Sequence, residues 1–366
     1  MIRYLSKTNP RVLKGVALVR LDFNTEDEWR MRAVLPTVRF LLKLASKIII
    51  VSHKGRPNGW DKKLSLRKSV KYLERMLGRR INFIQHFDFR KIKELIGKSA
   101  QKSIFVLENI RFLKGESSKN LELARKLASL ADYYVNDAFA VSHHGSNSVS
   151  KVESFLPNYA GLELEKELKF LSNVLENPRR PLVLVLGGGK SADKLDVIKN
   201  LRSKVDLFLL GGAPANTILF LMGIDVKNSL RDKDRKDLKN LRTILNYRNL
   251  CLPVDFKWKD RAILDIGEKT MRVFGEKIRS AKTVFWNGPM GVMEKKPYDK
   301  GTLAVARAIV KNRKAFTLAG GGETVMFLKK YKLDRKFGFI STGGGAMLDF
   351  LAGKKLPGIE ALKKSK

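Results

Sequence analysis

The stretch LVLVLGGGKSADK, residues 182–194, joins five apolar residues directly to three glycines and a lysine. The apolar run predicts a strand buried on both faces, and the polar residues after it can open a helix. A glycine turn at a strand end lets backbone N–H groups approach an anion, and a helix N-terminus favours negative charge. Lys190 and Lys194 would lie one helical turn apart. The stretch therefore predicts a phosphate site.

The alternative interpretation is a βα turn whose glycines only permit a tight bend. A Walker A loop is excluded, because GxxxxGK[ST] requires glycine five positions before Gly189 and Leu184 stands there. The case for phosphate chemistry therefore depends on the rest of the chain.

Strand and helix alternate before residue 156. We expect strands at 16–23, 47–52, 81–84, 104–107 and 133–135, and helices at 36–44, 66–77 and 121–130. Repeated βαβ order predicts a parallel sheet covered by helices on both faces, with ligands beyond the carboxyl ends of the strands.

Polar and basic residues follow several of these strands. They include Asp22, Asn24, Arg30, His53, Arg56 and Arg111. If the arginines and His53 meet at one sheet edge, they form a basin for a small anion such as a phosphate ester. The alternative is that they are scattered and solvated. The adjacent His143 and His144 lack a third ligand at suitable spacing, so we expect no metal there.

Residues 156–176 read as a long amphipathic helix that bridges two domains. Every tandem glycine lies after residue 186. The strand-like runs in this half end in glycine-containing loops, at 187–189, 211–212, 286–289, 320–322 and 343–345. Together they predict a backbone-lined cradle for a nucleotide and its phosphates. Two half-sites on two domains imply phosphoryl transfer with closure that expels water.

The amino-acid composition limits the kinds of protein that this chain can be. The chain has 366 residues, 44% of them hydrophobic, and a formal charge of +37. No apolar run reaches the ~18 residues of a membrane span, and the first residues do not form a secretory signal, so we expect a cytoplasmic protein. Cys251 lies in an apolar run and is expected to be a small buried hydrophobe. The excess of lysine and arginine attracts polyanions, but most of it falls on helix faces and no RNA-binding signature is present.

The chain resembles the phosphoglycerate kinase family over nearly its whole length. The motifs that carry the resemblance are VRLDFN (19–24), SHKGRP (52–57), LENIRFLKGE (107–116), YVNDAF (134–139), LGGGKSADK (186–194), LPVD (252–255), LDIG (264–267), WNGPMGVME (286–294), GGGET (320–324) and ISTGGGA (340–346). The trimmed loops are similar to those of the archaeal branch.

The resemblance implies an α/β fold of two Rossmann-like three-layer αβα domains with mainly parallel sheets, joined by a long interdomain helix and hinge. It implies an N-terminal phosphoglycerate-binding domain (1–155), the interdomain helix (156–177), a C-terminal nucleotide-binding domain (178–345) and a segment returning to the N-terminal domain (346–366).

The resemblance also implies the reaction, a reversible phosphoryl transfer from 1,3-bisphosphoglycerate to MgADP that gives 3-phosphoglycerate and MgATP. This is a glycolytic phosphotransferase reaction with a carboxyl group as acceptor, without a covalent intermediate. Matching positions make Arg30, Lys194, Gly343 and Gly344 catalytic. The phosphoglycerate-binding positions are Asp22, Asn24, Arg30, His53, Arg56, Arg111 and His144. The nucleotide-binding positions are Lys190, Lys194, Gly211, Gly212, Asn287, Pro289, Glu294, Gly320, Gly321, Gly322, Glu323 and Thr324.

The resemblance also implies a cofactor and binding partners, and two residues differ from the usual family pattern. Mg²⁺ is the expected cofactor, held mainly by nucleotide phosphates with Glu323 as the metal-linked carboxylate. Glu323 replaces the more usual aspartate, and His144 stands where the family usually carries an arginine. We expect a monomer that has no membrane partner and no specific nucleic-acid binding. The competing hypothesis is a basic nucleic-acid-binding protein on the same scaffold.

Overall fold

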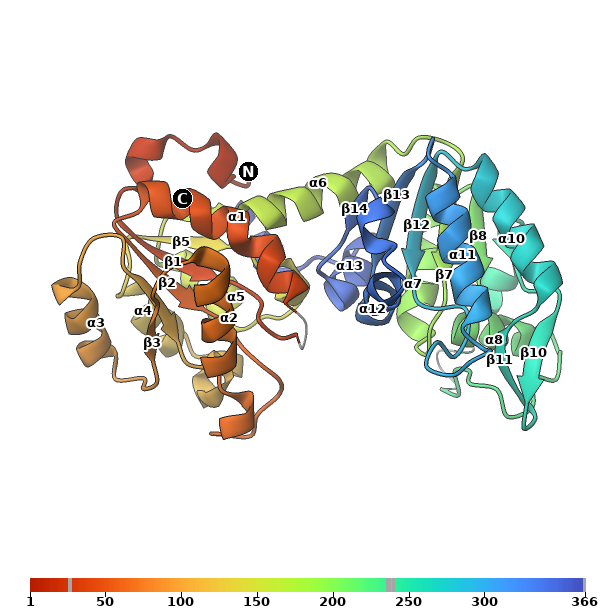
Figure 1. The fold of residues 1–366 in the computed structure, drawn as a ribbon, viewed down its shortest axis with the longest axis horizontal. Coiled ribbons are helices and arrows are strands. Elements are labelled where there is room, and N and C mark those ends of the chain that lie inside the picture. Colours follow the sequence, from red (N-terminus) through yellow and green to blue (C-terminus); the bar gives the residue numbers. More distant parts are fainter. Residues whose placement is uncertain (26–27, 235–237, 239–240, 365–366) are drawn as a thin grey trace. The chain divides into compact units, whose positions relative to one another are not determined.

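The computed structural model describes residues 1–25, 28–234, 238 and 241–364. It divides into two compact units (Figure 1). Unit 1 comprises Met1–Lys169 and Lys355–Lys366, and unit 2 comprises Phe170–Lys354. The units therefore divide inside the predicted bridging helix, after residue 169, and the returning segment begins at residue 355 rather than 346.

Unit 1 is built on a six-stranded parallel sheet of order β3-β4-β2-β1-β5-β6. Its strands are β1 Val16–Arg20, β2 Lys47–Val51, β3 Asn82–Ile84, β4 Ile104–Leu107, β5 Tyr133–Asn136 and β6 Asn158–Ala160. Its helices are α1 Trp29–Leu44, α2 Arg67–Leu77, α3 Phe89–Lys98, α4 Glu122–Ala128, α5 Asn147–Ser150 and α14 Pro357–Lys363, and α6 Leu162–Glu176 begins in it. The predicted parallel α/β architecture is confirmed.

Successive residues of the unit 1 strands enter two different hydrophobic cores. Ala17 and Val19 pack with residues of α1 and α2, whereas Leu18 packs with residues of α3 and α4. Because side chains alternate across a strand, the two cores lie on opposite faces of the sheet. This is why β1 reads as a continuous apolar run instead of an alternating one.

Unit 2 repeats this plan with a six-stranded parallel sheet of order β14-β13-β12-β7-β8-β9. Its strands are β7 Leu182–Leu186, β8 Leu207–Leu210, β9 Leu250–Cys251, β12 Thr283–Asn287, β13 Phe316–Gly320 and β14 Phe339–Ile340. Its helices are α7 Ala192–Leu201, α8 Gly212–Leu221, α10 Glu268–Ser280, α11 Lys300–Lys311, α12 Gly322–Lys330 and α13 Gly344–Leu351. Unit 2 also contains a separate two-stranded antiparallel sheet, formed by β10 Phe256–Lys259 and β11 Ala262–Ile266.

Strand β7 lies inside the sheet of unit 2, between β12 and β8. All five of its residues are buried, as the sequence predicts. Val183 and Val185 pack against α10, α11 and α12. Because ligands of parallel sheets bind beyond the carboxyl ends of the strands, this position places residues 187–190 at the sheet edge where a ligand is expected.

Two predicted helix starts are wrong. The helix expected from residue 36 begins at Trp29, and Pro36 lies inside it. Burial of Val34, Val38 and Leu41 on the core side outweighs the one backbone hydrogen bond that a proline removes. The bridging helix begins at Leu162, not at 156, because residues 158–160 form strand β6 beside β5.

The start of α6 is fixed by a carboxylate from another element. Asp137, just after β5, accepts hydrogen bonds at Oδ1 from the backbone N–H groups of Glu163 (3.0 Å) and Leu164 (2.9 Å). These are first-turn N–H groups that lack partners inside the helix, so Asp137 caps it. Gly161 lies against this carboxyl and has no room for a Cβ there. No local pattern in residues 156–162 contains this information.

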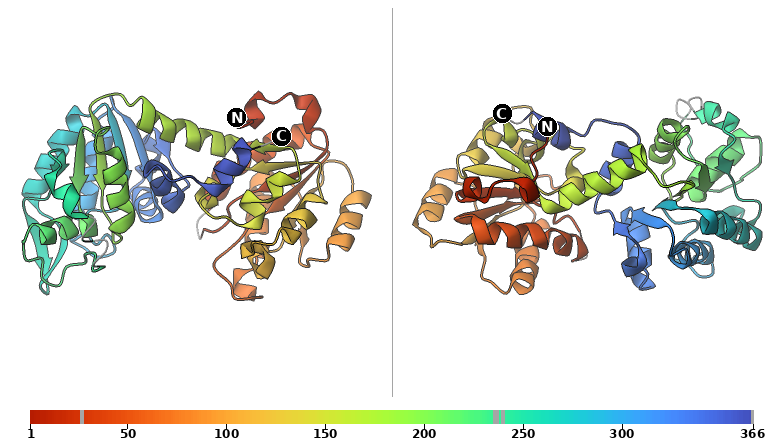
Figure 2. Two further views of the ribbon diagram at one scale, coloured as in Figure 1. Left: turned by 180° about the vertical axis from the view of Figure 1, so that it is seen from behind. Right: turned by 90° about the horizontal axis from the view of Figure 1, so that it is seen from above.

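Both ends of the described chain belong to unit 1 and lie side by side in both views of Figure 2. The N-terminal ammonium donates to the carbonyl of Lys363, 3.4 Å away, and α14 packs on α5 and β6. Within the described ranges, no helix is long and apolar enough to cross a membrane.

Candidate active site

The residues after β1 form a connected polar network. Arg30, in the first turn of α1, donates from Nη1 to Asp22 Oδ2 (3.2 Å) and to the carbonyl of Asn24 (3.1 Å). Asn24 Oδ1 accepts from the backbone N–H of Gly55 (2.8 Å), which ties this loop to the loop after β2. The Nε of Arg30 is buried without a hydrogen-bond partner. Arg30 therefore keeps a donor for a ligand.

A cavity of about 470 Å³ lies in the same unit. Its basic lining residues are Arg56, Arg111 and His144. Arg111, in the 3₁₀ helix Ile110–Phe112, is fixed by a 2.7 Å hydrogen bond from Nη1 to the carbonyl of Gly55. Two permanently charged guanidiniums at one cavity suit a phosphate ester, which accepts paired charge-assisted hydrogen bonds.

Burial lowers the pKa of two histidines in this region, His144 and His53. Burial, together with His143, Arg111, Arg56 and Arg20, lowers the pKa of His144 to about 4. Burial and nearby cations also lower the pKa of His53 well below its usual range. His144 stacks on His143 at 4.0 Å between ring centroids and lines the cavity. His144 therefore faces the basic cavity.

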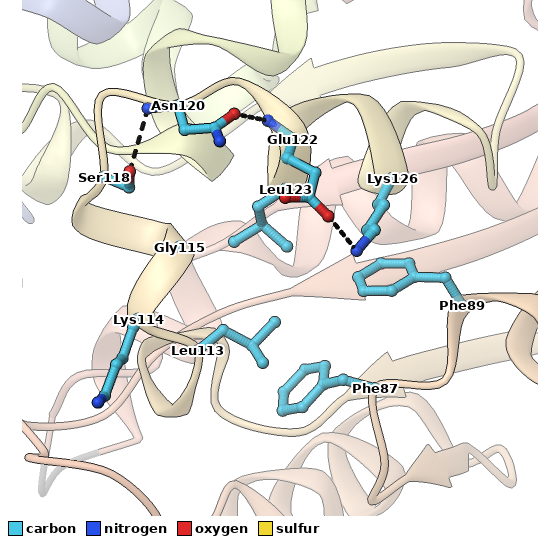
Figure 3. Close-up of a pocket in the computed structure, with 10 residues that line it drawn as sticks. All are labelled: Phe87, Phe89, Leu113, Lys114, Gly115, Ser118, Asn120, Glu122, Leu123 and Lys126. Atoms are coloured by element: carbon cyan, nitrogen blue, oxygen red, sulfur yellow. Dashed lines mark hydrogen bonds and ion pairs between the residues drawn. The ribbon is translucent and has the colours of Figure 1, made fainter.

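A second cavity of unit 1, of about 450 Å³, contains none of the predicted site residues (Figure 3). Four apolar side chains line one part of it, and polar or charged residues line the rest; the apolar ones are Phe87, Phe89, Leu113 and Leu123. It adjoins the 3₁₀ helix Lys114–Ser117, whose Ser117 lines the basic cavity. Of its two lysines, Lys126 donates to Glu122, and no arginine among the described residues lines the cavity.

In unit 2 the glycine loops pack against one another. Gly188 N–H donates to the carbonyl of Pro289 (2.7 Å), and its own carbonyl accepts from Ala213 N–H (2.9 Å). Gly212 adopts a φ of +55°, and a Cβ there would lie 2.7 Å from the carbonyl oxygen of Gly188. Glycine is thus required both for the backbone conformation and for the close approach of the loops. Part of the predicted cradle is therefore backbone packing.

A pocket of about 200 Å³ lies beside these loops. Of the predicted nucleotide-binding residues, Gly212, Pro289, Glu294 and Glu323 line it. The remaining lining residues are Gly188, Gly189, Ala213, Asn216, Leu230, Ile263, Leu264, Asp265, Met290, Gly291 and Val292. An apolar wall with a carboxylate at Glu294 suits a nucleoside, whose base is apolar on its faces and whose ribose offers hydroxyl donors.

Lys190 and Lys194 differ in their surroundings. Lys190 precedes helix α7 and is exposed, so the two lysines do not share one helix as predicted. Lys194, in the first turn of α7, is only 7% exposed. Burial lowers the pKa of its ammonium, and Asp193 and Glu323 oppose this shift. Among the described residues, no carboxylate oxygen lies within 4 Å of the Lys194 ammonium, the distance expected of an ion pair. The charge of Lys194 is therefore left for a ligand.

Two further helix N-termini meet beside this region. Gly321 caps α12 and Gly343 caps α13, and a Cβ on Gly344 would lie 3.6 Å from the Cα of Gly321. The N–H groups of a first helical turn lack intrahelical partners and favour an anion. The helix starts after β13 and β14 thus suit a phosphate group.

Some predicted residues serve the scaffold. Asn287 Nδ2 donates to the carbonyl of Gly320 (2.9 Å), and Thr324 Oγ1 accepts from Gly288 N–H (2.7 Å). A Cβ on Gly211 would meet Met290, and one on Gly320 would meet Met347. These contacts fix the loops that line the pocket. Sequence reasoning missed Asn216 and Leu230, which reach the pocket only through the packing of α8 against the loop after it.

A basic cavity in one parallel α/β unit and a glycine-lined pocket in the other define a kinase that acts on a small phosphorylated substrate. A family model for phosphoglycerate kinase matches residues 11–354. The chain is 39% identical to phosphoglycerate kinase of Dictyoglomus turgidum, covering 96% of each chain, and 38% identical to that of Pseudothermotoga lettingae, covering 95% of this chain and 96% of the relative. It also superposes on the crystal structure of phosphoglycerate kinase from Pyrococcus horikoshii with a TM-score of 0.87 and 31% identity, over 100% of this chain and 99% of the other.

The chain therefore belongs to the phosphoglycerate kinase family. The family reaction is reversible phosphoryl transfer from 1,3-bisphosphoglycerate to ADP, which gives 3-phosphoglycerate and ATP. The predicted family, fold and enzyme class are confirmed.

Proposed function

We propose that unit 1 binds the phosphoglycerate and unit 2 binds the nucleotide, and that transfer proceeds by neutralising the charge of the phosphoryl group in flight. The observation that carries this proposal is Lys194, a cation that is 7% exposed at the N-terminus of α7. Burying a charge without a paired carboxylate is costly, and Asp193 and Glu323 offset only part of that cost. Such a charge is expected where an anionic ligand supplies the compensation.

In unit 1, Arg56, Arg111 and His144 would hold the substrate phosphate, because they line one cavity. Asp22, Asn24, Arg30 and His53 would bind the rest of the phosphoglycerate. Asp22 holds Arg30 in place, and the free Nε of Arg30 is the donor for the group being transferred. A guanidinium suits this task because its charge is permanent and its fork geometry matches phosphate oxygens.

In unit 2, Lys190 and Lys194 would bind the nucleotide phosphates, and Glu294 would accept hydrogen bonds from the ribose hydroxyls. Gly343 and Gly344, at the start of α13, would direct backbone N–H groups at the transferred phosphate. Gly211, Gly212, Asn287, Pro289, Gly320, Gly321, Gly322 and Thr324 would shape the nucleotide site.

No general base is needed for this chemistry. In the direction of ATP consumption the acceptor is a carboxylate, whose ordinary pKa of about 3.5 to 4 leaves it ionised at neutral pH. Phosphoryl transfer depends chiefly on positioning and on electrostatic stabilisation. Arg30 and Lys194 are the two side chains that would supply that stabilisation.

The residues of the nucleotide pocket fit Mg²⁺ bound through the nucleotide. The described residues form no cluster of three or more His, Cys, Asp or Glu that could hold a metal alone. The carboxylate of Glu323 lines the pocket beside Gly188. Mg²⁺ is commonly held by one or two carboxylates together with substrate phosphates, and there it neutralises phosphate charge. Glu323 is the residue that would hold it.

Because the two substrates would bind to different units, transfer requires the units to bring them together. The chain passes between the units after residues 169 and 354, and these two crossings are the proposed hinge. Closure would also exclude water, which would otherwise accept the phosphoryl group. We further propose a cytoplasmic monomer without specific nucleic-acid binding.

A coupled assay of ATP formation from 1,3-bisphosphoglycerate and MgADP tests this function. Activity that disappears when either substrate is omitted supports it. Glu294→Gln is the companion variant, and its KM should rise for ADP while KM for 1,3-bisphosphoglycerate stays unchanged. A folded protein that forms no ATP would favour the competing nucleic-acid hypothesis.

A further inference from the structure

Arg20, the last residue of β1, is a buried arginine that belongs to neither predicted half-site. It is 1% exposed. Its Nε donates to Ser148 Oγ (2.9 Å), its Nη1 donates to the carbonyl of Leu21, and its Nη2 lies 3.2 Å from His53 Nδ1. Every nitrogen of this guanidinium therefore has a partner, and one of those partners is a predicted substrate-binding side chain.

Ser148, which accepts from the Arg20 guanidinium, is in turn hydrogen-bonded to Glu116. Ser148 Oγ donates to Glu116 Oε1 (2.6 Å), and Ser148 N–H donates to Glu116 Oε2 (3.0 Å). Glu116 is 2% exposed, and it acts on Arg20 through the serine, since no direct ion pair joins them among the described residues. Glu116, Ser148, Arg20 and His53 thus form a buried relay with a single order of donors and acceptors.

This order of donors and acceptors determines which nitrogen of the His53 imidazole carries the proton. A guanidinium has only donors, so His53 Nδ1 must accept and its proton must be on Nε2. The alternative is an Nδ1–H that donates to Asp22. Asp22 Oδ1 is 3.7 Å from Nδ1, beyond hydrogen-bond distance.

Two other observations agree with a neutral Nε2–H imidazole. The pKa of His53 is lowered well below its usual range by burial and by the neighbouring titratable groups Arg20, Arg111, His144 and Arg30, and the carboxylate of Asp22, 3.7 Å away, does not reverse this shift. In addition, His53 Nε2 is buried and has no hydrogen-bond partner. A buried donor without an acceptor is costly, so an incoming oxygen that accepts from it is favoured.

We propose that Arg20 is a positioning residue that holds His53 as the neutral Nε2–H tautomer, so that Nε2–H donates to an oxygen of the bound phosphoglycerate. This inference rests on the proposed binding of phosphoglycerate in unit 1. His53 then contributes a hydrogen bond and no charge, and the arginines supply the charge. Arg20 acts through His53 and does not touch the substrate.

Imidazole ¹⁵N NMR of the whole protein tests the tautomer directly, with the His53→Gln variant assigning the signal. We expect Nε2 protonated and Nδ1 unprotonated from pH 6 to 8.5, and a shift of the Nε2–H proton on adding 3-phosphoglycerate. A protonated Nδ1, or a titration near the ordinary value of about 6.5, overturns the inference. An active enzyme whose His53 signals ignore 3-phosphoglycerate also overturns it. Loss of the reaction itself would appear separately, in the coupled assay.

The Arg20→Lys variant tests the positioning role, because an ammonium keeps the charge but cannot reach three acceptors in one plane. We expect mixed His53 tautomers and a KM for 3-phosphoglycerate raised about tenfold, with the KM for ATP unchanged. Arg39→Lys, an exposed change on α1, is the control and should alter neither. If Arg20→Lys does not fold, Ser148→Ala should also give mixed His53 tautomers and a raised KM for 3-phosphoglycerate, both to a smaller extent. Weaker substrate binding with an unaltered His53 tautomer would show that Arg20 is only structural and would overturn the inference.

Discussion

Arg30 Nη1 and Asp22 Oδ2 lie 3.2 Å apart, so a carboxylate of the site holds the arginine that is expected to meet the transferred phosphoryl group. Asp22 is buried and Arg30 is mostly so. An arginine oriented in advance loses little side-chain freedom when charge develops beside it. This pair therefore predicts that Arg30 acts mainly in the transition state.

Arg30→Ala should lower kcat by roughly a hundredfold or more and leave the KM for ADP nearly unchanged. Arg30→Lys should restore little, because an ammonium lacks the fork of donors. Steady-state kinetics with each substrate varied in turn measure both effects. A loss confined to KM would mean that Arg30 binds only the ground state.

Lys194→Met should also lower kcat by about a hundredfold or more, without loss of thermal stability. Stability should be kept because the variant removes a buried, poorly compensated charge and retains an apolar side chain of similar length. Lys199→Met, in the last turn of the same helix, is the control and should retain activity. A Lys194→Met protein that is fully active, or that melts well below the parent, would contradict the proposed role.

The KM for 3-phosphoglycerate should depend on pH through His144. Its pKa is about 4 in the ligand-free protein, and a bound phosphate raises the pKa of a neighbouring imidazole. Substrate binding then takes up a proton at pH values between the free and bound pKa. Affinity therefore falls as the pH rises through that window.

The measurement is the KM from pH 5 to 8.5 in the parent and in His144→Arg. The parent KM should rise more steeply, and the variant should bind more tightly at the alkaline end, by about tenfold for one charged hydrogen bond. His86→Arg, an exposed change in unit 1, should behave as the parent. Parallel curves of equal height would place His144 outside the site.

Glu163→Gln should stabilise the protein at pH 8 but not at pH 5. Burial, with Glu167 and Asp137 nearby, raises the pKa of Glu163 to about 8, and this effect outweighs Lys166, whose Nζ is 3.6 Å away. Between about pH 4.5 and 8 the unfolded chain has released this proton and the folded protein retains it, so stability falls as the pH rises. The gain at pH 8 should be roughly 1 to 3 kcal/mol.

Urea denaturation at the two pH values tests this prediction, with Glu176→Gln at the exposed end of the same helix as control. The control should change stability little at either pH. Equal stability of parent and Glu163→Gln at pH 8 would mean that Glu163 is ionised in the folded protein.

The sequence predicted what local patterns encode. Strand β4 has the predicted bounds, and Gly78 ends α2 in the left-handed conformation expected of a glycine after a helix. Side chains that act across the fold were not predictable. Arg20 reads as one polar residue in a buried strand, and only its contacts with Ser148 and His53 show what it does. Asp137 likewise belongs to a motif of the chain but caps a helix that begins 25 residues later.

The candidate site shows the same division. Glycine-rich loops were identified from the sequence, but the contact of Gly188 with Gly212 was not, because close packing between loops depends on the order of strands in the sheet. For the same reason the apolar wall that Leu230 gives the nucleotide pocket could not be predicted.

Hydrogen–deuterium exchange of the whole chain, with each substrate added alone, tests most directly whether each substrate binds to its own unit. We expect 3-phosphoglycerate to slow exchange in residues 22–25, 28–30, 53–57, 109–117 and 143–147, and to leave the glycine loops unchanged. MgADP should slow exchange in residues 187–194, 212–217 and 288–294, and leave the basic cavity unchanged. Protection of the glycine loops by 3-phosphoglycerate alone, or of the basic cavity by MgADP alone, would contradict the account.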